Sequence, residues 1–419
     1  MENGWTTSKL GELIQTLKGY AFKSQWYSNV GVPLVKVSNF TDDSIDVEGL
    51  SRIPDDISAN YRRYTLKTND VVIQTVGSWP TNPQSVVGKV IRVPIKANGA
   101  LLNQNAVKII PNKAVDIGFL FYALKLPTFK NYIVGCAQGA ASQASITLDA
   151  IKNYDFTFPK LEYQRKISAI LSAYDDLIEN NTRRIQILEE MARRIYEEWF
   201  VWFRFPGHEN VKMVESELAL IPFGWNAKQL GDIAQEVRNT VGPSEVESST
   251  PYVGLEHIPR RSIALMDWDE AKNVQSTKHI FKAGNILFGK IRPYFHKVSV
   301  APIDGICSTD AIVIEAKKRE MFPFVLCVVS SDTFVQHATQ TSNGVNMPRA
   351  NWAALLKYPV YIPTKDLRKR FSDFIEPTLT RIKNLTFKIR NLRQTRDLLL
   401  PKLISGEIDV SNFPEPMND

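Results

Sequence analysis

The sequence predicts an α+β protein with two similar domains in an inverted pseudo-twofold arrangement, joined by two long antiparallel coiled-coil helices. Two observations lead to this prediction. The chain contains one order of motifs twice, and each half ends in a long segment of heptad-spaced apolar residues. A length of 419 residues also exceeds what one ordinary hydrophobic core organises, so we expect at least two domains.

The composition is that of a globular protein, because 44% of the residues are hydrophobic and 23% are charged. The net charge of +7 favours a polyanionic partner, although proteins that bind nothing acidic also carry such an excess. Three scattered cysteines without a CxxC pair indicate neither a zinc site nor a disulfide framework. The chain starts without signal-peptide features and has no apolar run of membrane-spanning length, so we expect a soluble, cytoplasmic protein with no membrane partner.

The first half of each repeat opens with a tryptophan five residues before a Leu-Gly-acid triplet. "WTTSKLGEL" begins at Trp5 and "WNAKQLGDI" at Trp225, and the strand-like runs "VPLVKVSNF" and "TPYVGLEHI" follow them. Next come "LKTNDVVIQ" and "FKAGNILFG", in which Asp70 and Asn285 occupy the same place in a turn that leads into a strand.

The second half of each repeat continues in the same order. The strands "NAVKIIP" and "DAIVIEA" precede the helical segments "GFLFYALKLPTF" and "FPFVLCVVSSDTF". A Gly-centred polar loop follows in each half, "AQGAASQASI" and "TSNGVNMPRA", and then a strand ending in proline. Matches in one order from beginning to end favour a duplicated domain over chance similarity. The predicted boundaries are residues 1–160 and 206–363 for the domains, 161–205 and 364–406 for the helices, and 407–419 for a tail.

The two helical segments carry a heptad seam, which predicts that they pack on each other. The seam of the first is Ile167, Leu171, Tyr174, Ile178, Asn181, Ile185, Leu188, Ala192, Ile195, Trp199 and Trp202. The seam of the second is Ile375, Thr378, Ile382, Leu385, Ile389, Leu392, Arg396, Leu399 and Leu403, and Pro401 and Gly406 mark its end. Asn181 sets the register of the pair or is a partly exposed polar residue, and both interpretations stay open.

The aromatic segment "EEWFVWFRF" has more large rings than one seam accommodates. It packs into the root of the adjoining domain, or it forms a docking patch for another protein. The second interpretation makes its rings partner-binding residues, namely Trp199, Phe200, Trp202 and Phe203.

The two helical regions identify a resemblance that covers essentially the whole chain. "TFPKLEYQRKISAILSAYDDLIENNTRRIQILEEMARRIYEEWF" and "LRQTRDLLLPKLISGEIDV" resemble the conserved helical regions of the DNA-specificity (S) subunits of type I restriction-modification enzymes. The openings "LGEL" and "LGDI" and the segment "GNILFGKIRPYFHKV" are similar to the target-recognition domains of that family.

The resemblance implies a non-catalytic, sequence-specific DNA-binding subunit that acts in phage defence. Each target-recognition domain would read one half of a bipartite, asymmetric site in double-stranded DNA, and the helices would set the spacing. Two methylation (M) subunits would dock on this chain and bring S-adenosylmethionine. Restriction (R) subunits would bring ATP and Mg²⁺, so no cofactor or metal is expected in this chain.

Candidate DNA-binding residues lie in the polar loops beside glycine, because Arg, Lys, Asn and Gln read base edges and basic or hydroxyl groups hold phosphates. In the first domain these are Gln74, Ser78, Asn82, Gln84, Lys89, Gln138, Ser142 and Gln143. In the second they are Lys290, Arg292, Tyr294, His296, Lys297, Asn343, Asn346 and Arg349. The pairs in "YRRY" and "PRRS" are better phosphate candidates: Arg62, Arg63, Arg260 and Arg261. The two loop sets differ in chemistry, so the two half-sites should differ in sequence.

Three alternatives compete with this interpretation. Asp304, Glu315 and Lys317 follow the spacing of a Mg²⁺-dependent nuclease, but the equivalent stretch of the first domain has no carboxylates. A methyltransferase would need a base-holding Asn/Asp-Pro-Pro motif and a Gly-rich cofactor turn, and neither occurs. The third alternative is a scaffold whose domains bind proteins rather than DNA, and a salt-dependent shift of duplex DNA would discriminate against it.

Overall fold

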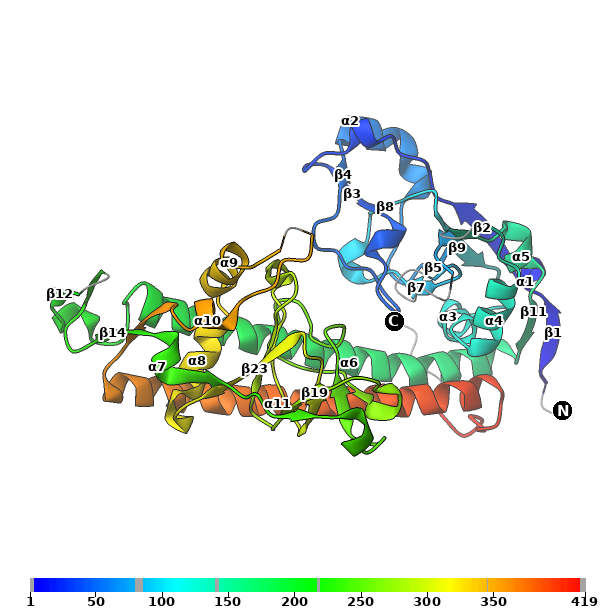
Figure 1. The fold of residues 1–419 in the computed structure, drawn as a ribbon. Helices are drawn as coiled ribbons and strands as arrows, with labels where there is room; N and C mark the ends of the chain where they lie inside the picture. Colours follow the sequence, from blue (N-terminus) through cyan, green and yellow to red (C-terminus); the bar gives the residue numbers. More distant parts are fainter. Residues whose placement is uncertain (1–3, 80–85, 140–142, 217–218, 345, 415–419) are drawn as a thin grey trace. The chain divides into compact units, whose positions relative to one another are not determined.

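The computed structural model describes residues 4–79, 86–139, 143–216, 219–344 and 346–414. The chain divides into two compact units (Figure 1). Unit 1 consists of Met1–Asp176 together with Gln394–Asp419, and unit 2 consists of Leu177–Arg393. Among the described helices, none is long and apolar enough to cross a membrane.

Each unit is built on a four-stranded antiparallel sheet, and the two sheets share one strand order. In unit 1 the order is β2 (Ile14–Lys18), β9 (Ala106–Pro111), β5 (Val71–Gln74) and β7 (Val90–Arg92). In unit 2 it is β15 (Ala234–Glu236), β23 (Ala311–Ala316), β20 (Ile286–Gly289) and β21 (Val298–Val300). The predicted strand pairs therefore occupy equivalent places, which confirms this part of the repeat.

The smaller sheets repeat as well. In unit 1, β3 (Val32–Val35) pairs in parallel with β8 (Leu101–Leu102) and antiparallel with β4 (Arg52–Ile53). In unit 2, β17 (Pro251–Val253) does the same with β22 (Gly305–Cys307) and β18 (Asp269–Glu270), and β19 (Lys278–Phe281) and β16 (Thr240–Val241) extend the sheet. The remaining antiparallel pairs are β1 (Thr6–Lys9) with β11 (Asp155–Phe158), β14 (Asn226–Gln229) with β24 (Pro359–Ile362), and β12 (Met213–Glu215) with β13 (Leu220–Pro222).

The short helices other than α2 (Asp55–Ser58) follow the same repeat and cover the main sheets with apolar side chains. Both predicted helical segments are confirmed, and each is a pair of helices broken by a turn. The helices of unit 1 are α1 (Leu10–Leu13), α2 (Asp55–Ser58), α3 (Ile117–Leu124), α4 (Pro127–Gly135) and α5 (Leu148–Lys152). Those of unit 2 are α7 (Leu230–Ile233), α8 (Phe322–Val329), α9 (Asp332–Gln340) and α10 (Trp352–Leu355).

The turn before each central strand has the same geometry in both units. The side chain of Asp70 accepts a hydrogen bond from the Lys67 amide at 2.7 Å, and that of Asn285 accepts one from the Lys282 amide at 2.7 Å. Asp and Asn favour such turns because their short side chains bond to nearby backbone. The predicted equivalence of Asp70 and Asn285 is thereby confirmed.

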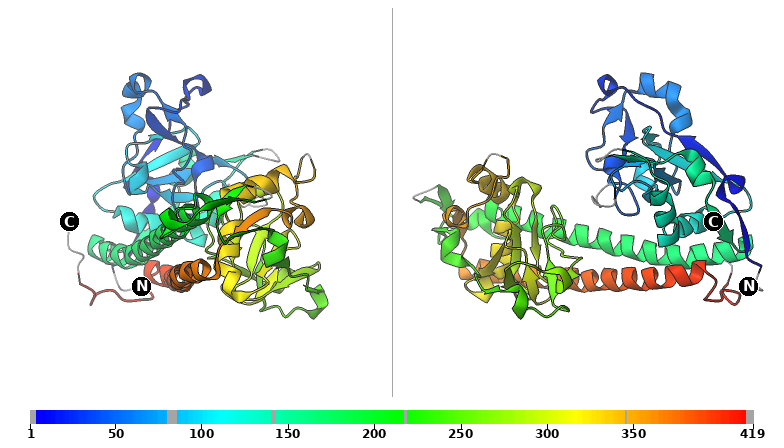
Figure 2. Two further views of the ribbon diagram at one scale, coloured as in Figure 1. Left: turned by 90° about the vertical axis from the view of Figure 1, so that its left-hand side faces the viewer. Right: turned by 45° about the vertical axis from the view of Figure 1, so that its right-hand side comes forward.

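The two long helices are α6 (Leu161–Tyr196) and α11 (Lys365–Ile404), and they pack together through the predicted seams (Figure 2). Every seam position is buried or half-buried except Trp202, which is exposed and lies beyond the end of α6. Helix α11 continues through Pro401, three residues further than that proline suggested. Gly406 follows with φ +76°, a left-handed conformation that suits glycine after a helix end.

In each unit the two helices run antiparallel. In unit 1, Asp175 of α6 lies against Arg396 of α11, and Ile167 shares a core with Leu403. In unit 2, Trp199 just beyond α6 packs on Phe371 near the start of α11, with ring centroids 6.0 Å apart. Residue numbers thus rise along one helix as they fall along the other, as the sequence predicts.

Asn181 is buried within the helix pair of unit 2, with only 2% of its surface exposed. The alternative of a partly exposed residue is therefore wrong. Its side-chain Nδ2 has no hydrogen-bond partner among the described residues. A buried amide without a partner destabilises the pair, which is the known cost of a polar residue that specifies helix register.

A polar cluster joins the sheet domain of unit 1 to the long helices. The Arg396 guanidinium donates to Asp175 Oδ1 at 2.7 Å, and the Tyr122 hydroxyl donates to Asp175 Oδ2 at 2.5 Å. Arg92 lies 3.3 Å from the same carboxylate, and Asp43 lies 3.6 Å from Arg396. Burial and the neighbouring Asp175 charge raise the pKa of Tyr122, so the hydroxyl stays protonated and remains a donor.

In unit 2 one carboxylate of α6 holds the loop that follows β17. Glu189 accepts hydrogen bonds from the Ser262 hydroxyl at 2.7 Å and from the amides of Ile263 and Ala264 at 2.8 and 3.1 Å. Burial raises the pKa of Glu189, although these three bonds oppose the shift. The Glu189 carboxylate therefore holds the loop at residues 262–264 against α6, and its charged form is partly desolvated.

We expect Glu189→Gln to abolish one pH-dependent contribution to the stability of unit 2. A raised folded-state pKa means that the stabilisation is complete below the unfolded pKa of about 4.3 and is lost as pH rises through the folded value. The wild type should therefore lose stability relative to Glu189→Gln between pH 4.5 and neutral pH. Urea unfolding of both proteins across this range measures the difference, and a difference that instead grows in favour of the wild type contradicts the expectation.

Candidate nucleic-acid interface

In unit 1, the two polar loops singled out in the sequence lie side by side. Strand β6 (Val76–Gly77), which follows β5, pairs with β10 (Ala144–Ser145) in the second loop. Gln138 and Ser145 then exchange backbone hydrogen bonds at 2.9 and 2.8 Å. Gln138 and Gln143 are exposed, so the described part of this loop pair presents amide side chains to solvent.

Unit 2 brings its two loops together in the same way. Ile291, just after β20, forms a bridge with Arg349, and Arg349 exchanges backbone hydrogen bonds with Asn343 at 2.8 and 2.9 Å. The two bridges place Arg349 where unit 1 has Ser145, and Asn343 where unit 1 has Gln138. The scaffold of the loop pair is thus common to both units, whereas its side chains differ.

A glycine makes each tight loop possible. Gly139 has φ +149°, and a Cβ there would lie 2.1 Å from the Gln143 carbonyl oxygen, so any side chain would collide with backbone. Gly344 has φ +98°, and a Cβ there would lie 3.2 Å from the Met347 carbonyl oxygen. Glycine is therefore required at the centre of each loop, because the backbone there is left-handed and passes close to a carbonyl oxygen.

Unit 2 adds a third segment to its loop pair. Arg260 forms a bridge with Lys297, and the Arg261 amide donates to the His296 carbonyl at 2.9 Å. The Arg260 guanidinium lies over the Phe295 ring at 4.1 Å. Exposed basic, amide and aromatic side chains of these three segments form what we call the unit 2 reading surface: Arg260, Arg261, Arg292, Tyr294, Asn343, Asn346 and Arg349.

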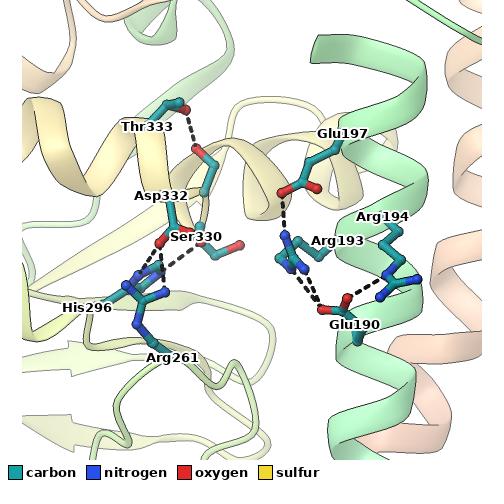
Figure 3. Close-up of polar contacts among 10 residues, drawn as sticks. Glu190, Arg193, Arg194, Glu197, Arg261, His296, Ser330, Asp332 and Thr333 are labelled. Carbon is teal, nitrogen blue, oxygen red and sulfur yellow. Dashed lines mark hydrogen bonds and ion pairs between the residues drawn. The ribbon is translucent and has the colours of Figure 1, made fainter. Parts of the chain in front are cut away.

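Two predicted residues beside this surface, His296 and Lys297, form hydrogen bonds within the protein instead of facing solvent. His296 is buried, and its Nε2 donates to the Ser330 carbonyl at 2.9 Å, because a carbonyl can only accept (Figure 3). Burial lowers the pKa of His296, which the Ser330 bond and the Asp332 charge oppose. Lys297 donates to the Leu255 carbonyl, and burial together with the Arg260 charge lowers its pKa. Lys290 is half-buried between the loops.

The other predicted residues of unit 1 lie in varied settings. Gln74 is fully buried on central strand β5 and donates to the Val76 carbonyl at 3.0 Å. Ser78 and Lys89 are half-buried beside the loop pair. Arg62 and Arg63 are exposed on a 3₁₀ helix (Ala59–Tyr64) next to the small sheet. The predicted residues Asn82, Gln84 and Ser142 lie outside the described residues.

The aromatic segment after α6 divides between the two interpretations offered for it. Trp199 and Phe200 are buried in the main core of unit 2, and Phe203 packs against that core. Trp202 has 59% of its surface exposed. Trp199 and Phe200 lie in a π-helical turn (Glu197–Val201), and Trp202 is the residue that follows this turn.

The residues of the alternative nuclease site each bond to different partners. Asp304 accepts from the Ala283 amide and from Lys282, both at 2.9 Å. Glu315 accepts from Gln235 at 3.3 Å, and Lys317 donates to the Gly231 carbonyl at 2.5 Å. In the part of the chain that the structure describes, no group of three His, Cys, Asp or Glu side chains is placed to hold a metal ion.

Sequence reasoning missed two acidic residues of unit 2 that contact the predicted cations. Asp332 lies 2.9 Å from Arg261, and Asp310 lies 3.7 Å from Arg349. The segment "SSDTF" reads as an ordinary helix start with Ser331 as its cap, and only the tertiary fold brings Asp332 to the loops.

Comparisons with known proteins agree with this architecture. Residues 2–190 match the family described as "Type I restriction modification DNA specificity domain". The chain is 26% identical over 331 residues to the type I restriction enzyme MjaIX specificity subunit of Methanocaldococcus jannaschii, covering 77% of this chain and 76% of that protein. It is 30% identical over 230 residues to the EcoDI specificity subunit of Escherichia coli, covering 49% and 47%.

The fold has a counterpart among solved structures. The crystal structure of a type I restriction-modification S subunit from M. genitalium superposes with a TM-score of 0.57 at 15% identity, covering 96% of each chain. At that identity the likeness establishes the fold, namely two β-rich domains with two long helices packed together. The sequence matches and this shared fold show that the chain is similar to the DNA-specificity (S) subunits of type I restriction-modification systems, whose family model matches residues 2–190.

Proposed function

We propose that each recognition domain of this chain reads one half of a bipartite, asymmetric DNA site. The observation that carries the proposal is the pair of equivalent loop scaffolds with unlike side chains. Arg349 stands where unit 1 has Ser145, and Asn343 stands where unit 1 has Gln138. Arginine favours guanine in the major groove and serine has no fixed preference, so unlike half-sites follow from one shared fold.

The proposed contacts divide by exposure and chemistry. Exposed amide and guanidinium groups at the loop tips are suited to base edges: Gln138, Gln143, Arg292, Asn343, Asn346 and Arg349. Exposed or half-buried basic groups around them are suited to phosphates: Arg62, Arg63, Lys89, Arg260, Arg261 and Lys290. Gln74, His296 and Lys297 are held by backbone carbonyls, which gives them a structural role in supporting the loops.

The long helices are proposed to set the spacing of the half-sites and to dock two methylation subunits. Exposed apolar side chains support a docking role where they lie close together, because contiguous exposed apolar surface marks protein interaction sites. On α6 these are Leu177, Ile187 and Met191, and Trp202 follows beyond it. S-adenosylmethionine would belong to those subunits, and ATP and Mg²⁺ to the restriction subunits of a complete complex.

A gel shift with duplex DNA at increasing salt tests the DNA-reading function. We expect binding that weakens linearly on a log–log scale, by about 10³-fold between 50 and 200 mM salt if about six phosphates are contacted. The physical reason is the release of counterions when basic groups neutralise phosphates. Assembly with methylation subunits but no salt-dependent shift of any duplex would instead favour a scaffold that binds only proteins.

A further inference from the structure

The unit 2 reading surface is built on unusual backbone. Arg261, Arg292 and His296 all have left-handed conformations, with φ values of 54°, 50° and 52°. Such values are uncommon for residues other than glycine and persist only where the surroundings hold them in place. Arg292 and His296 flank a short 3₁₀ helix (Pro293–Phe295) that carries the exposed ring of Tyr294. The surface therefore depends on whatever fixes these three residues.

One carboxylate lies at the junction of two of them. Asp332 is the first residue of α9, and its Oδ1 lies 2.9 Å from the Arg261 guanidinium and 3.2 Å from His296 Nδ1 (Figure 3). The opposite ring nitrogen of His296 donates to the Ser330 carbonyl, two residues earlier in the chain. The Ser330 carbonyl thereby holds the His296 ring, and Asp332 holds Arg261, whereas His296 Nδ1 has no hydrogen-bond partner among the described residues.

The Asp332–Arg261 ion pair is exposed, which favours a role in positioning over a role in stabilising the fold. The side chains of Asp332 and Arg261 are 62% and 66% exposed, and ion pairs at such exposure contribute little to folding. The carboxylate also places a negative charge on a surface that is otherwise basic, which weakens attraction to DNA phosphates. The Asp332 carboxylate adds little to stability and repels DNA. Its presence is explained if it fixes the conformation of the reading surface.

We propose that Asp332 is a positioning residue for half-site recognition by unit 2. It acts through Arg261, whose amide donates to the His296 carbonyl, and so holds the segments carrying Arg260 and Arg292 in the conformation in which Arg292 meets base edges. Unit 1 has Pro127 at the equivalent first position of α4, so this device belongs to one half-site only. The inference rests on the proposed function and adds a specificity determinant to it.

The test uses the full-length chain with a duplex pool that is randomised in sequence. The wild type should enrich a bipartite sequence, and its affinity is then measured for duplexes in which one half or the other is replaced. We expect Asp332→Asn to reduce discrimination at one half by about tenfold and to leave discrimination at the other half at the wild-type value. Asp332→Glu, which keeps the carboxylate, should recover part of the loss.

Asp304→Asn is the matched control. Asp304 is 60% exposed, lies 2.9 Å from Lys282 and belongs to the same unit, so its replacement removes the same charge and a similar pair. Both variants should bind all duplexes somewhat more tightly, and only Asp332→Asn should change a discrimination ratio. Wild-type ratios in Asp332→Asn, or equal loss at both halves, would overturn the inference alone. A wild type that enriches no bipartite sequence would refute the proposed function and this inference with it.

Discussion

Replacing residues 206–363 by the second recognition domain of a related S subunit should change one half of the recognised sequence completely and leave the other half unchanged. The reason lies in the construction of the units. The loop pair of unit 1 is formed by backbone bridges within unit 1, between Ser145 and both Val76 and Gln138, and none of these residues is exchanged. The long helices also stay the same, so the number of base pairs between the half-sites should stay constant.

Mapping of methylated adenines in a host that carries the chimera with its methylation subunits measures this result. The reciprocal replacement of residues 1–160 is the matched control and should change only the other half. Alteration of both halves by either replacement would show that the loops of one domain depend on the other. A changed gap would show that something besides the helices sets the spacing.

Arg396→Ala should lower the free energy of unfolding of unit 1 by about 3 kcal/mol. Arg396 and Asp175 are only 14% and 15% exposed, and their closest approach is 2.7 Å. Loss of the guanidinium leaves a desolvated carboxylate whose remaining donors are Tyr122 and Arg92. Removing one partner of a buried pair costs more than the pair itself contributes, because the other charge stays behind.

Native-state hydrogen exchange distinguishes the units in this experiment. Amides of β5 in unit 1 should lose protection in Arg396→Ala, whereas amides of β20 in unit 2 should keep theirs. Arg165→Ala is the charge-matched control, because Arg165 is an exposed residue of α6 in the same unit. Equal protection of β5 in the two variants would mean that the Arg396 cluster does not hold the helices to the sheet domain.

Most of the fold was predictable because its signals are periodic or local. The heptad spacing from Ile167 to Trp199 is a property of the helix repeat itself, and the seam is buried where the spacing places it. Asp70 and Asn285 direct the same turn by hydrogen bonds that span three residues. Patterns of this kind are visible in a single sequence because the period of the seam and the bonds of the turn are both set by residues a few positions apart.

The candidate site was predictable only as a set of loops. His296 stands between aromatic and basic residues in "PYFHK", which reads as an exposed basic loop, yet a left-handed backbone turns its ring into the protein. Gln74 continues a strand whose residues are all buried, because β5 is an inner strand of its sheet. Asp332 joins the loops through contacts that span 36 to 71 residues of sequence, and no local pattern reports such contacts.

Unit 1 is assembled from two segments that are separated in the sequence by unit 2, and this fixes an order of events during synthesis on the ribosome. Its core includes Leu403, Ile404 and Val410 from the segment that follows unit 2, and Lys166 of α6 donates to the Ser411 carbonyl. All residues of unit 2 are translated before that segment, although unit 1 starts first. The sheet domain of unit 1 therefore completes its interior only after unit 2 has been translated, and the apolar surface that receives Leu403, Ile404 and Val410 stays uncovered until then.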